Sequence, residues 1–506
     1  MDLYTLALLA FLVYAVYTLI WRAYFSPLSH IPGPRLAALT FLYEAYYDIW
    51  LDGQYTFKII ELHKKYGPIM RITPDELHIS DPDFFDTIYA PSSSPRRSDK
   101  DPRFTKFIGL DQSVFSTIHH EKHRQRRAAL NTYFSMGNVR RLQGVIQERL
   151  DVMVGRMREW RGKGEVLDVS CMVSAFGNES PNFDPSSRNA ALAGISSIHI
   201  MKHIPWVNNF MKKLPDPLIE KLIPSLTSFL KLKRSSKQQV QEIIAGENEE
   251  WKGRDHMTIF HAILDSKLPP EEKTVERLSE DAQVLVMAGT LTTASTLEMV
   301  TYWLLEQPET LRKLKEELRT VMPGVEDVGK VPLAVLEGLP YLTGVIKEGL
   351  RLSHGLSARS QRVDPDNPIL FTDKETGTEY TIPPKTPVSI TPVQIHLTEE
   401  IFPDSNDFIP ERWLGDSGKK LDRYLVSFMK GSRACLGINL AYGELYMVVA
   451  HMWRVWGSRE VRGDGDELGW LELCGTERRD VVVERDLFIP SARKGGEGVR
   501  VLVHGV

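Results

Sequence analysis

Apolar residues recur at helical spacing over three long stretches of the chain. Leu3 to Trp21 carries no charge, and Ser279 to Gln307 is apolar with a period close to that of a helix. A third apolar run, from Ile438 to Trp456, directly follows a glycine. This spacing predicts helices, the second beginning at Ser279 as its N-cap and ending before a proline. Residues 140–275 show the amphipathic form of the pattern and predict a series of further helices.

Short alternating stretches with turn signals predict hairpins between the helices. Ile69–Ile72 and Leu77–Ser80 are strand patterns separated by the four residues of Thr73–Glu76. Asp373–Gly377 and Ile382–Lys385 carry the glycine and proline signals of further hairpin turns.

The first apolar stretch is long enough to cross a membrane. Its 19 residues, at about 1.5 Å each, span about 28 Å, roughly one hydrocarbon core. No basic segment precedes it and no small-residue cleavage site follows it, which favours an uncleaved anchor over a signal peptide or a buried helix. Arg22 and Arg35 follow the stretch, whereas only Asp2 precedes it, so the positive-inside rule places the bulk of the chain in the cytosol. The prolines of residues 26–34 then predict a stiff linker.

Composition excludes several classes of protein. The 62 basic and 66 acidic residues are interspersed and give a net charge of −4, which does not suit a nucleic-acid-binding protein. Only three cysteines occur in 506 residues, too few for a disulfide framework, which indicates a reducing compartment.

A cysteine between two glycines carries the clearest candidate chemistry. Cys435 lies four residues after Gly431 and two before Gly437, and Phe428 and Arg433 precede it. A thiol in a tight turn before a helix can ligate a metal, because the helix N-terminus and nearby cations lower its pKa. Arg433 could pair with an anionic group of the ligand. The alternative is a buried free cysteine, since free cysteine is among the most buried residue types.

The spacing Phe-x-x-Gly-x-Arg-x-Cys-x-Gly resembles the haem-binding signature of the cytochrome P-450 family. The resemblance implies that Cys435 is the proximal thiolate ligand of haem iron, with Phe428, Gly431, Arg433 and Gly437 around heme b (iron protoporphyrin IX). It extends over essentially the whole chain and implies the family's mainly α fold with a smaller β-rich part. Residues 1–22 are then an N-terminal transmembrane anchor, 23–40 a proline-rich hinge and 41–506 the haem-thiolate catalytic domain.

The middle of the second long helix differs in composition from its two apolar ends. Residues 288–296 pack glycine, threonine and serine into an apolar helix, and such local conflicts often mark functional sites. Close helix packing is the alternative. The run resembles the family's oxygen-activation motif, which implies Gly289 as the oxygen groove and Thr292 as the proton-delivery threonine. Leu291 stands where the family usually has an acid, and a leucine cannot relay protons.

Two further segments supply candidate ligands for the haem propionates. In the basic segment from His119 to Phe134, a zinc site is excluded because Arg124 occupies the second histidine position of H-E-x-x-H. His123 and Arg127, four residues apart on one helix face, match the family's propionate-binding positions. Farther along, Arg362 is the better match to the propionate-binding arginine, with Arg359 as the competitor.

Glu348 and Arg351 lie three residues apart on one predicted helix face, which is usually a surface ion pair. They match the family's Glu-x-x-Arg motif, and Arg412 matches its second arginine. The resemblance implies that the three form a buried structural triad rather than a catalytic group.

The resemblance implies a monooxygenase that inserts one oxygen atom from O2 into an apolar small molecule. Residues 463–469 miss the spacing of a dinucleotide loop, so electrons must come from another protein, NADPH-cytochrome P-450 reductase, with cytochrome b5 as a further candidate.

The sequence is similar to microsomal, trichodiene oxygenase-like fungal enzymes. This similarity implies a single-pass protein of the endoplasmic reticulum membrane and a terpenoid or polyketide substrate of secondary metabolism. Two alternatives stay open: a haem-thiolate isomerase or dehydratase, and a non-catalytic haem-binding protein. The stretch Leu167–Phe183 is also shorter than the corresponding segment that the resemblance to such enzymes implies.

Overall fold

The computed structural model describes residues 2–91, 93–105, 109–174, 186–248, 258–462 and 467–505. Most of Leu167–Phe183 lies outside these residues. The described chain is mainly helical, with small sheets. The longer helices are α1 (Leu3–Ile20), α4 (Tyr55–Tyr66), α7 (His120–Asn131), α9 (Gln143–Trp160), α11 (Ser186–Ser196), α15 (Thr227–Ala245), α17 (Val275–Glu306), α18 (Pro308–Val321), α20 (Pro340–Ser353) and α23 (Ile438–Val455).

Shorter helices connect these elements. They are α2 (Arg35–Leu39), α3 (Leu42–Ala45), α5 (Phe85–Ile88), α6 (Pro102–Thr105), α8 (Met136–Arg141), α10 (Val169–Ser174), α12 (Ile198–His203), α13 (Pro205–Met211), α14 (Asp216–Leu222), α16 (Ile259–Leu264), α19 (Leu333–Leu336), α21 (Pro392–His396) and α22 (Gly415–Leu421).

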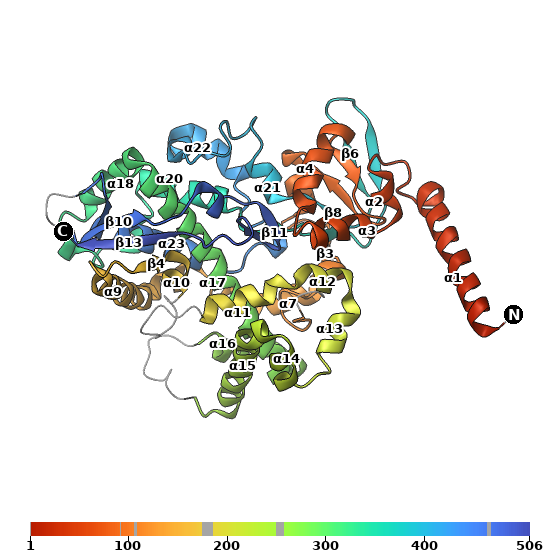
Figure 1. Cartoon of the computed structure of the whole chain (residues 1–506), viewed down its shortest axis with the longest axis horizontal. Coiled ribbons are helices and arrows are strands. Elements are labelled where there is room, and N and C mark those ends of the chain that lie inside the picture. Colours follow the sequence, from red (N-terminus) through yellow and green to blue (C-terminus); the bar gives the residue numbers. More distant parts are fainter. Residues whose placement is uncertain are drawn as a thin grey trace.

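A five-stranded sheet forms most of the β-rich part, on the side of the molecule next to α1 (Figure 1). Its strands follow the order β1 (Ile69–Arg71), β2 (Leu77–Ile79), β8 (Val388–Ser389), β5 (Arg362–Val363) and β3 (Asp99–Lys100). The predicted first hairpin is confirmed, since β1 and β2 pair antiparallel with Ile69 opposite Ile79. At the other edge, Lys100 lies opposite Arg362, which places two cations side by side.

The remaining strands form a four-stranded sheet and two hairpins. The sheet has the order β4 (Val166–Asp168), β13 (Arg500–Gly505), β10 (Gly469–Leu473) and β9 (Trp456–Ser458). The hairpins are β6 (Ile369–Thr372) with β7 (Glu379–Ile382), and β11 (Arg485–Leu487) with β12 (Ile489–Ser491). The first of these hairpins turns at the predicted Asp373–Gly377.

Helix α17 is the central element of the helical part and packs against α10, α11, α15, α18, α20 and α23. The predicted N-cap at Ser279 is wrong. The helix begins one turn earlier, where the Thr274 side chain accepts from the backbone N–H of Arg277, and Ser279 instead donates to the carbonyl of Glu276. The hydrophobic pattern missed this turn because its charges are paired: Arg277 Nη2 lies 3.0 Å from Asp281 Oδ2, and both side chains are buried.

Helix α1 projects away from the rest of the molecule, and none of its residues is buried (Figure 1). The apolar segment Leu3–Phe25 is long and apolar enough to cross a membrane. Helix α17 passes the same length and composition test, but 44% of its apolar window is buried inside the protein, as expected for a core helix.

Candidate functional site

The loop before α23 is closed by its own backbone. The N–H of Cys435 donates to the carbonyl of Phe428 over 2.9 Å, and the Phe428 ring packs on Tyr442 of α23. Gly431 has φ +77°, and a Cβ there would lie 2.3 Å from the carbonyl oxygen of Tyr89. Only glycine therefore lets the chain pass this close to the β-rich part.

The thiol of Cys435 faces an opening inside the protein. Its side chain is exposed, although protein atoms surround it on most sides. A Cβ on Gly437 would meet only the Phe134 ring, at 4.0 Å, and a Cβ on Gly289 of α17 would meet nothing within 4 Å. Ala288 and Gly289 are exposed in the middle of an otherwise largely buried helix. These surfaces have room for a flat ligand beside the sulfur.

Burial raises the pKa of the Cys435 thiol, and the N–H of Gly437 and the guanidinium of Arg127 only partly offset it. The expectation that the helix N-terminus and nearby cations lower this pKa is therefore wrong for the protein alone. Removal from water disfavours the thiolate more than these dipoles and charges favour it. A metal cation on the sulfur would reverse the balance.

Five basic side chains gather beside this loop: Lys100, His123, Arg127, Arg362 and Arg433. Burial, together with Arg362, Arg433 and Arg127, holds the pKa of Lys100 well below its usual range. Burial and the same neighbours lower the pKa of His123 to about 2, and burial and Arg362 lower that of Arg433 to about 9. Asp99 is a carboxylate that partly opposes the shift of Arg433.

Such a group of buried like charges is costly unless an anion binds among them. The two carboxylates of haem b fit this requirement, and the sulfur and the open glycine surfaces fit its iron and its flat faces. Lys100 was not predicted from the sequence. Lys100 lies among these cations because β3 pairs with β5 and places it opposite Arg362, a contact that no local sequence pattern reveals.

Hydrogen bonds fix two of the predicted cations around the cysteine loop. Arg127 Nη1 donates to the carbonyl of Ala434 over 2.6 Å and so ties α7 to the loop. Arg433 donates to the carbonyls of Ser98, Thr117 and Ile118, which occupy three of its five N–H groups.

Arg362 and Arg359 lie in opposite electrostatic settings. Burial lowers the pKa of Arg362 to about 10, and its guanidinium lies over the Tyr89 ring at 5.0 Å. Arg359 is paired with Glu44 and with Glu76, whose Oε1 is 3.1 Å from its Nε. The charge of Arg359 is therefore balanced by carboxylates of the protein, whereas Arg362 lies among the buried cations.

The hydroxyl of Thr292 lies on the accessible stretch of α17 and donates to the carbonyl of Ala288 over 2.8 Å. Leu291 points elsewhere. It is 7% exposed and packs in an apolar cluster with Phe104, Ala191, Ile195 and Ile198. An acid at position 291 would have to be buried among these side chains.

An apolar wall continues from this cluster. The rings of Phe104, Phe115 and Phe488 lie 5.8–6.1 Å apart in pairs. Phe104, Phe488, Ile198 and Ala358 form the apolar side of a pocket whose other lining residues are charged or polar, among them Arg103, Lys202 and Asp486. The segment Gly355–Ser357 does not line this pocket and is packed within the protein. A Cβ on Gly355 would lie 2.0 Å from the Ser427 carbonyl oxygen, and Ser357 is buried and donates to Asp486. The next residue, Ala358, reaches the pocket.

The predicted triad forms as a buried unit. Arg351 binds both carboxylate oxygens of Glu348 at 2.7 and 2.9 Å, and Arg412 Nε donates to Oε1 at 3.0 Å. Trp413 Nε1 also donates to Glu348, over 2.8 Å, a partner that the motif did not predict. The free ends of Arg351 reach the carbonyls of His396, Ser405 and Asp407. The triad therefore has a structural role, because it ties α20 to the chain between His396 and Trp413.

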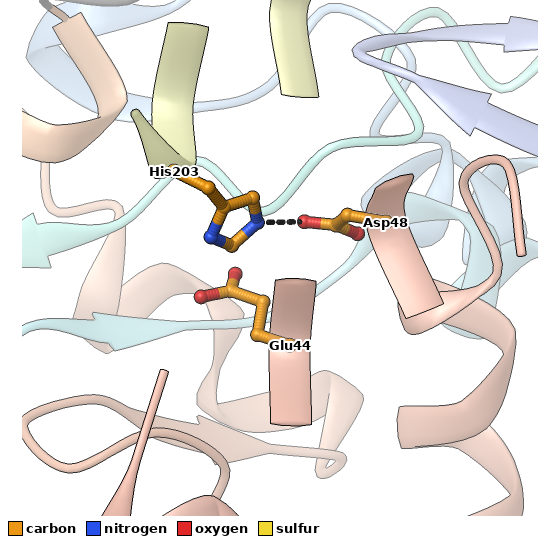
Figure 2. Close-up of side chains that lie close together, drawn as sticks. All are labelled: Glu44, Asp48 and His203. Atoms are coloured by element: carbon orange, nitrogen blue, oxygen red, sulfur yellow. Dashed lines mark hydrogen bonds and ion pairs between the residues drawn. The ribbon is translucent and has the colours of Figure 1, made fainter. Parts of the chain in front are cut away.

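A second group of potential metal ligands lies apart from the thiol, where Glu44, Asp48 and His203 point toward one another (Figure 2). His203 Nε2 lies 3.0 Å from Asp48 Oδ2. The ammonium of Lys202 already contacts both acids, at 2.5 Å from Glu44 and 2.9 Å from Asp48. This group is an internal ion-pair network that ties α12 to α3 and to the segment directly after it.

Comparison with known proteins gives a consistent result. Residues 36–456 match the family Cytochrome P450. The chain is 44% identical over 505 residues to cytochrome P450 monooxygenase tpcC of Cochliobolus heterostrophus, covering 97% of this chain and 95% of that protein. It is 41% identical to cytochrome P450 monooxygenase astB of Talaromyces wortmannii (98% and 97% covered). It is also 36% identical to tryptophan 6-hydroxylase fscE of Fusarium equiseti (95% and 93% covered).

Proposed function

The chain belongs to the cytochrome P450 family and is a haem-thiolate monooxygenase, and from this premise we propose how its residues bind haem b and hold the substrate. The names of its relatives favour this activity over an isomerase, a dehydratase or a non-catalytic haem protein. The observation that carries the residue assignment is an accessible thiol inside the fold, beside four buried basic side chains and the half-buried Arg127.

In this proposal, Cys435 ligates the haem iron, and Phe428, Gly431 and Gly437 shape the loop around it. Lys100, His123, Arg127, Arg362 and Arg433 bind the two propionates. When bound, haem b supplies the chemistry that activates O2. Gly289 leaves room for a ligand against the backbone of α17, and the Thr292 hydroxyl holds a proton there. The phenylalanine wall binds and orients the substrate and excludes water.

We propose an apolar terpenoid or polyketide intermediate of secondary metabolism as substrate, because Phe104, Phe115, Phe488 and Leu291 offer apolar surface. A second candidate is an aromatic amino acid derivative, which the name of the Fusarium equiseti relative favours. Electrons come from a separate NADPH-dependent reductase, with cytochrome b5 as a further donor. The exposed basic residues of α7, such as Lys122 and Arg124, are a candidate docking surface for either. The enzyme works at the endoplasmic reticulum membrane, held by α1, with its catalytic domain in the cytosol.

The difference spectrum of the reduced protein with carbon monoxide tests the ligand assignment. We expect the red-shifted thiolate band in the wild type and its loss in Cys435→Ser. Cys171→Ser is the control and should keep the band, because Cys171 lies in α10, far along the chain from the loop. Absence of the band from the wild-type protein would refute the assignment of Cys435.

A further inference from the structure

The pocket that Phe104 and Phe488 line has one apolar and one polar side. Ile198 and Ala358 complete the apolar side. Phe488 lies at the turn between β11 and β12 with φ +73°, a conformation that bulky residues rarely adopt. Asp486 Oδ1 stabilises this turn by accepting from the N–H of Phe488 over 2.9 Å. Strained backbone of this kind is concentrated at binding sites, which supports the pocket as part of the substrate site.

The charged residues on the polar side of the pocket already have partners within the protein. Arg359 and Lys202 share the carboxylate of Glu44, and Arg359 also binds Glu76. The remaining pairs are Arg103 with Asp75, Asp101 with the backbone N–H of Arg103, Asp486 with the hydroxyls of Thr56 and Ser357, and His199 with the carbonyl of Asp486. A charged group on a ligand would lose its water and would have to compete with these pairs. The pocket therefore favours a neutral ligand.

Gln361 is the exception on this polar side. Its side chain lines the pocket and is only 4% exposed, yet its Oε1 atom has no hydrogen-bond partner among the described residues. A buried amide oxygen without a donor is costly, and each such group in a folded protein needs an explanation. A hydrogen-bond donor on a bound ligand supplies one. Because Gln361 directly precedes Arg362, this donor would lie near the proposed propionate site.

We propose that Gln361 is a specificity-determining residue whose Oε1 accepts a hydrogen bond from a hydroxyl group of a neutral, otherwise apolar substrate. The inference rests on the proposed function and chooses between its two substrate classes. A terpenoid or polyketide alcohol satisfies the amide of Gln361 and packs its apolar part on Phe104 and Phe488. The charged groups of an amino acid find no unpaired counter-charge among the described lining residues.

Calorimetric titration of the full-length, haem-loaded protein tests this role with matched probes and needs no turnover. Farnesol and its methyl ether differ by one O–H donor, and 2-naphthol and 2-methoxynaphthalene form an aromatic pair of the same kind. We expect the wild type to bind at least one of the two alcohols about tenfold more tightly than its ether, the effect of about one net hydrogen bond. Tryptophan should bind more weakly than that alcohol.

Three variants assign the preference to one side chain. Gln361→Met keeps the length of the side chain but removes the acceptor, so the alcohol and the ether should bind equally. Gln361→Glu keeps an acceptor and should keep the preference. Gln394→Met is the matched control, because Oε1 of Gln394 in α21 also has no partner among the described residues but Gln394 is not among the residues that line the pocket. This control should match the wild type.

Equal affinities for alcohol and ether in the wild type, or no binding of any of these four probes, would overturn the proposal. An unchanged preference in Gln361→Met, or tighter binding of tryptophan than of either alcohol, would also overturn it. If Gln361→Met does not fold, the comparison of alcohol and ether in the wild type still decides. The carbon monoxide band of the same wild-type protein is measured separately. Its absence would refute the proposed function, whereas equal affinities in a protein that shows the band would refute only the role of Gln361.

Discussion

At the scale of single residues, what distinguishes two similar side chains is the charge around them. Arg359 and Arg362 are both fully buried arginines three residues apart in sequence. Glu44 and Glu76 compensate the charge of Arg359, whereas Lys100 and Arg433 oppose that of Arg362. A buried arginine whose charge is balanced by carboxylates is expected to have a purely structural role. A buried arginine that lacks such partners is expected to bind an anion.

Matched substitutions should therefore have opposite effects. We expect Arg362→Gln to weaken haem binding about tenfold and to raise the melting temperature of the haem-free protein, because a repelling charge is removed. Arg359→Gln should lower the free energy of unfolding by about 3–5 kcal/mol, the cost of leaving buried partners unpaired. Haem titration and thermal denaturation of both variants measure this. Equal haem affinities in the two variants would contradict the assignment of Arg362.

Glu444 of α23 accepts a hydrogen bond from Thr293 and predicts a pH dependence of stability. Its carboxyl pKa is raised to about 7 in the folded protein, so the folded state binds more protons than the unfolded state above the ordinary pKa of a carboxyl group. This contribution is fully present at low pH and is lost as the pH rises through about 7. Melting temperatures between pH 5 and 8 should fall more for the wild type than for Glu444→Gln. Parallel curves would mean that the carboxyl does not titrate in this range.

At the scale of elements, the Glu348 triad joins α20 to the segment that leads to the cysteine loop. Arg412 and Trp413, from the short helical turn Pro410–Trp413, and Arg351, from α20, all bind one carboxylate. Because all of these groups are buried or nearly so, the loss of one leaves the others without partners.

We expect Glu348→Gln to lower the free energy of unfolding by about 3–5 kcal/mol. Haem should be retained in the fraction that stays folded, because none of these residues lies with the buried cations. Denaturant unfolding followed by circular dichroism measures the change. Glu309→Gln removes the partner of exposed Arg312 in α18 and should leave the unfolding midpoint unchanged.

At the scale of the whole molecule, the apolar helix α1 is coupled to the β-rich part. The chain leaves α1 through a helical turn at Trp21–Phe25. In this turn, the Arg22 side chain donates to the carbonyl of Leu39, and the Arg71 side chain of β1 donates to the carbonyl of Arg22. These contacts, 2.8 and 3.0 Å long, set the direction of α1 relative to the β-rich part. The predicted stiff linker is therefore short and held at both ends.

Deletion of residues 3–20 should move the protein from the membrane pellet to the soluble fraction. Arg22→Ala is the matched comparison: it keeps the anchor and should stay in the membrane, while protease cleavage of the linker becomes faster. Fractionation and limited proteolysis of both variants measure this. A truncated protein that stays fully in the pellet would show that α1 is not the main attachment.

The sequence by itself determined the local features, because each depends on residues close together in the chain. The cysteine loop, the apolar N-terminal helix, the β1–β2 hairpin and the weak centre of α17 all follow from spacing and residue type. Tertiary structure alone decided which charges meet. Lys100 joins the buried cations through the pairing of β3 with β5, and Glu444 meets Thr293 because α23 packs on α17. Burial, which raises or lowers the pKa of each of these groups, exists only after the distant segments have come together.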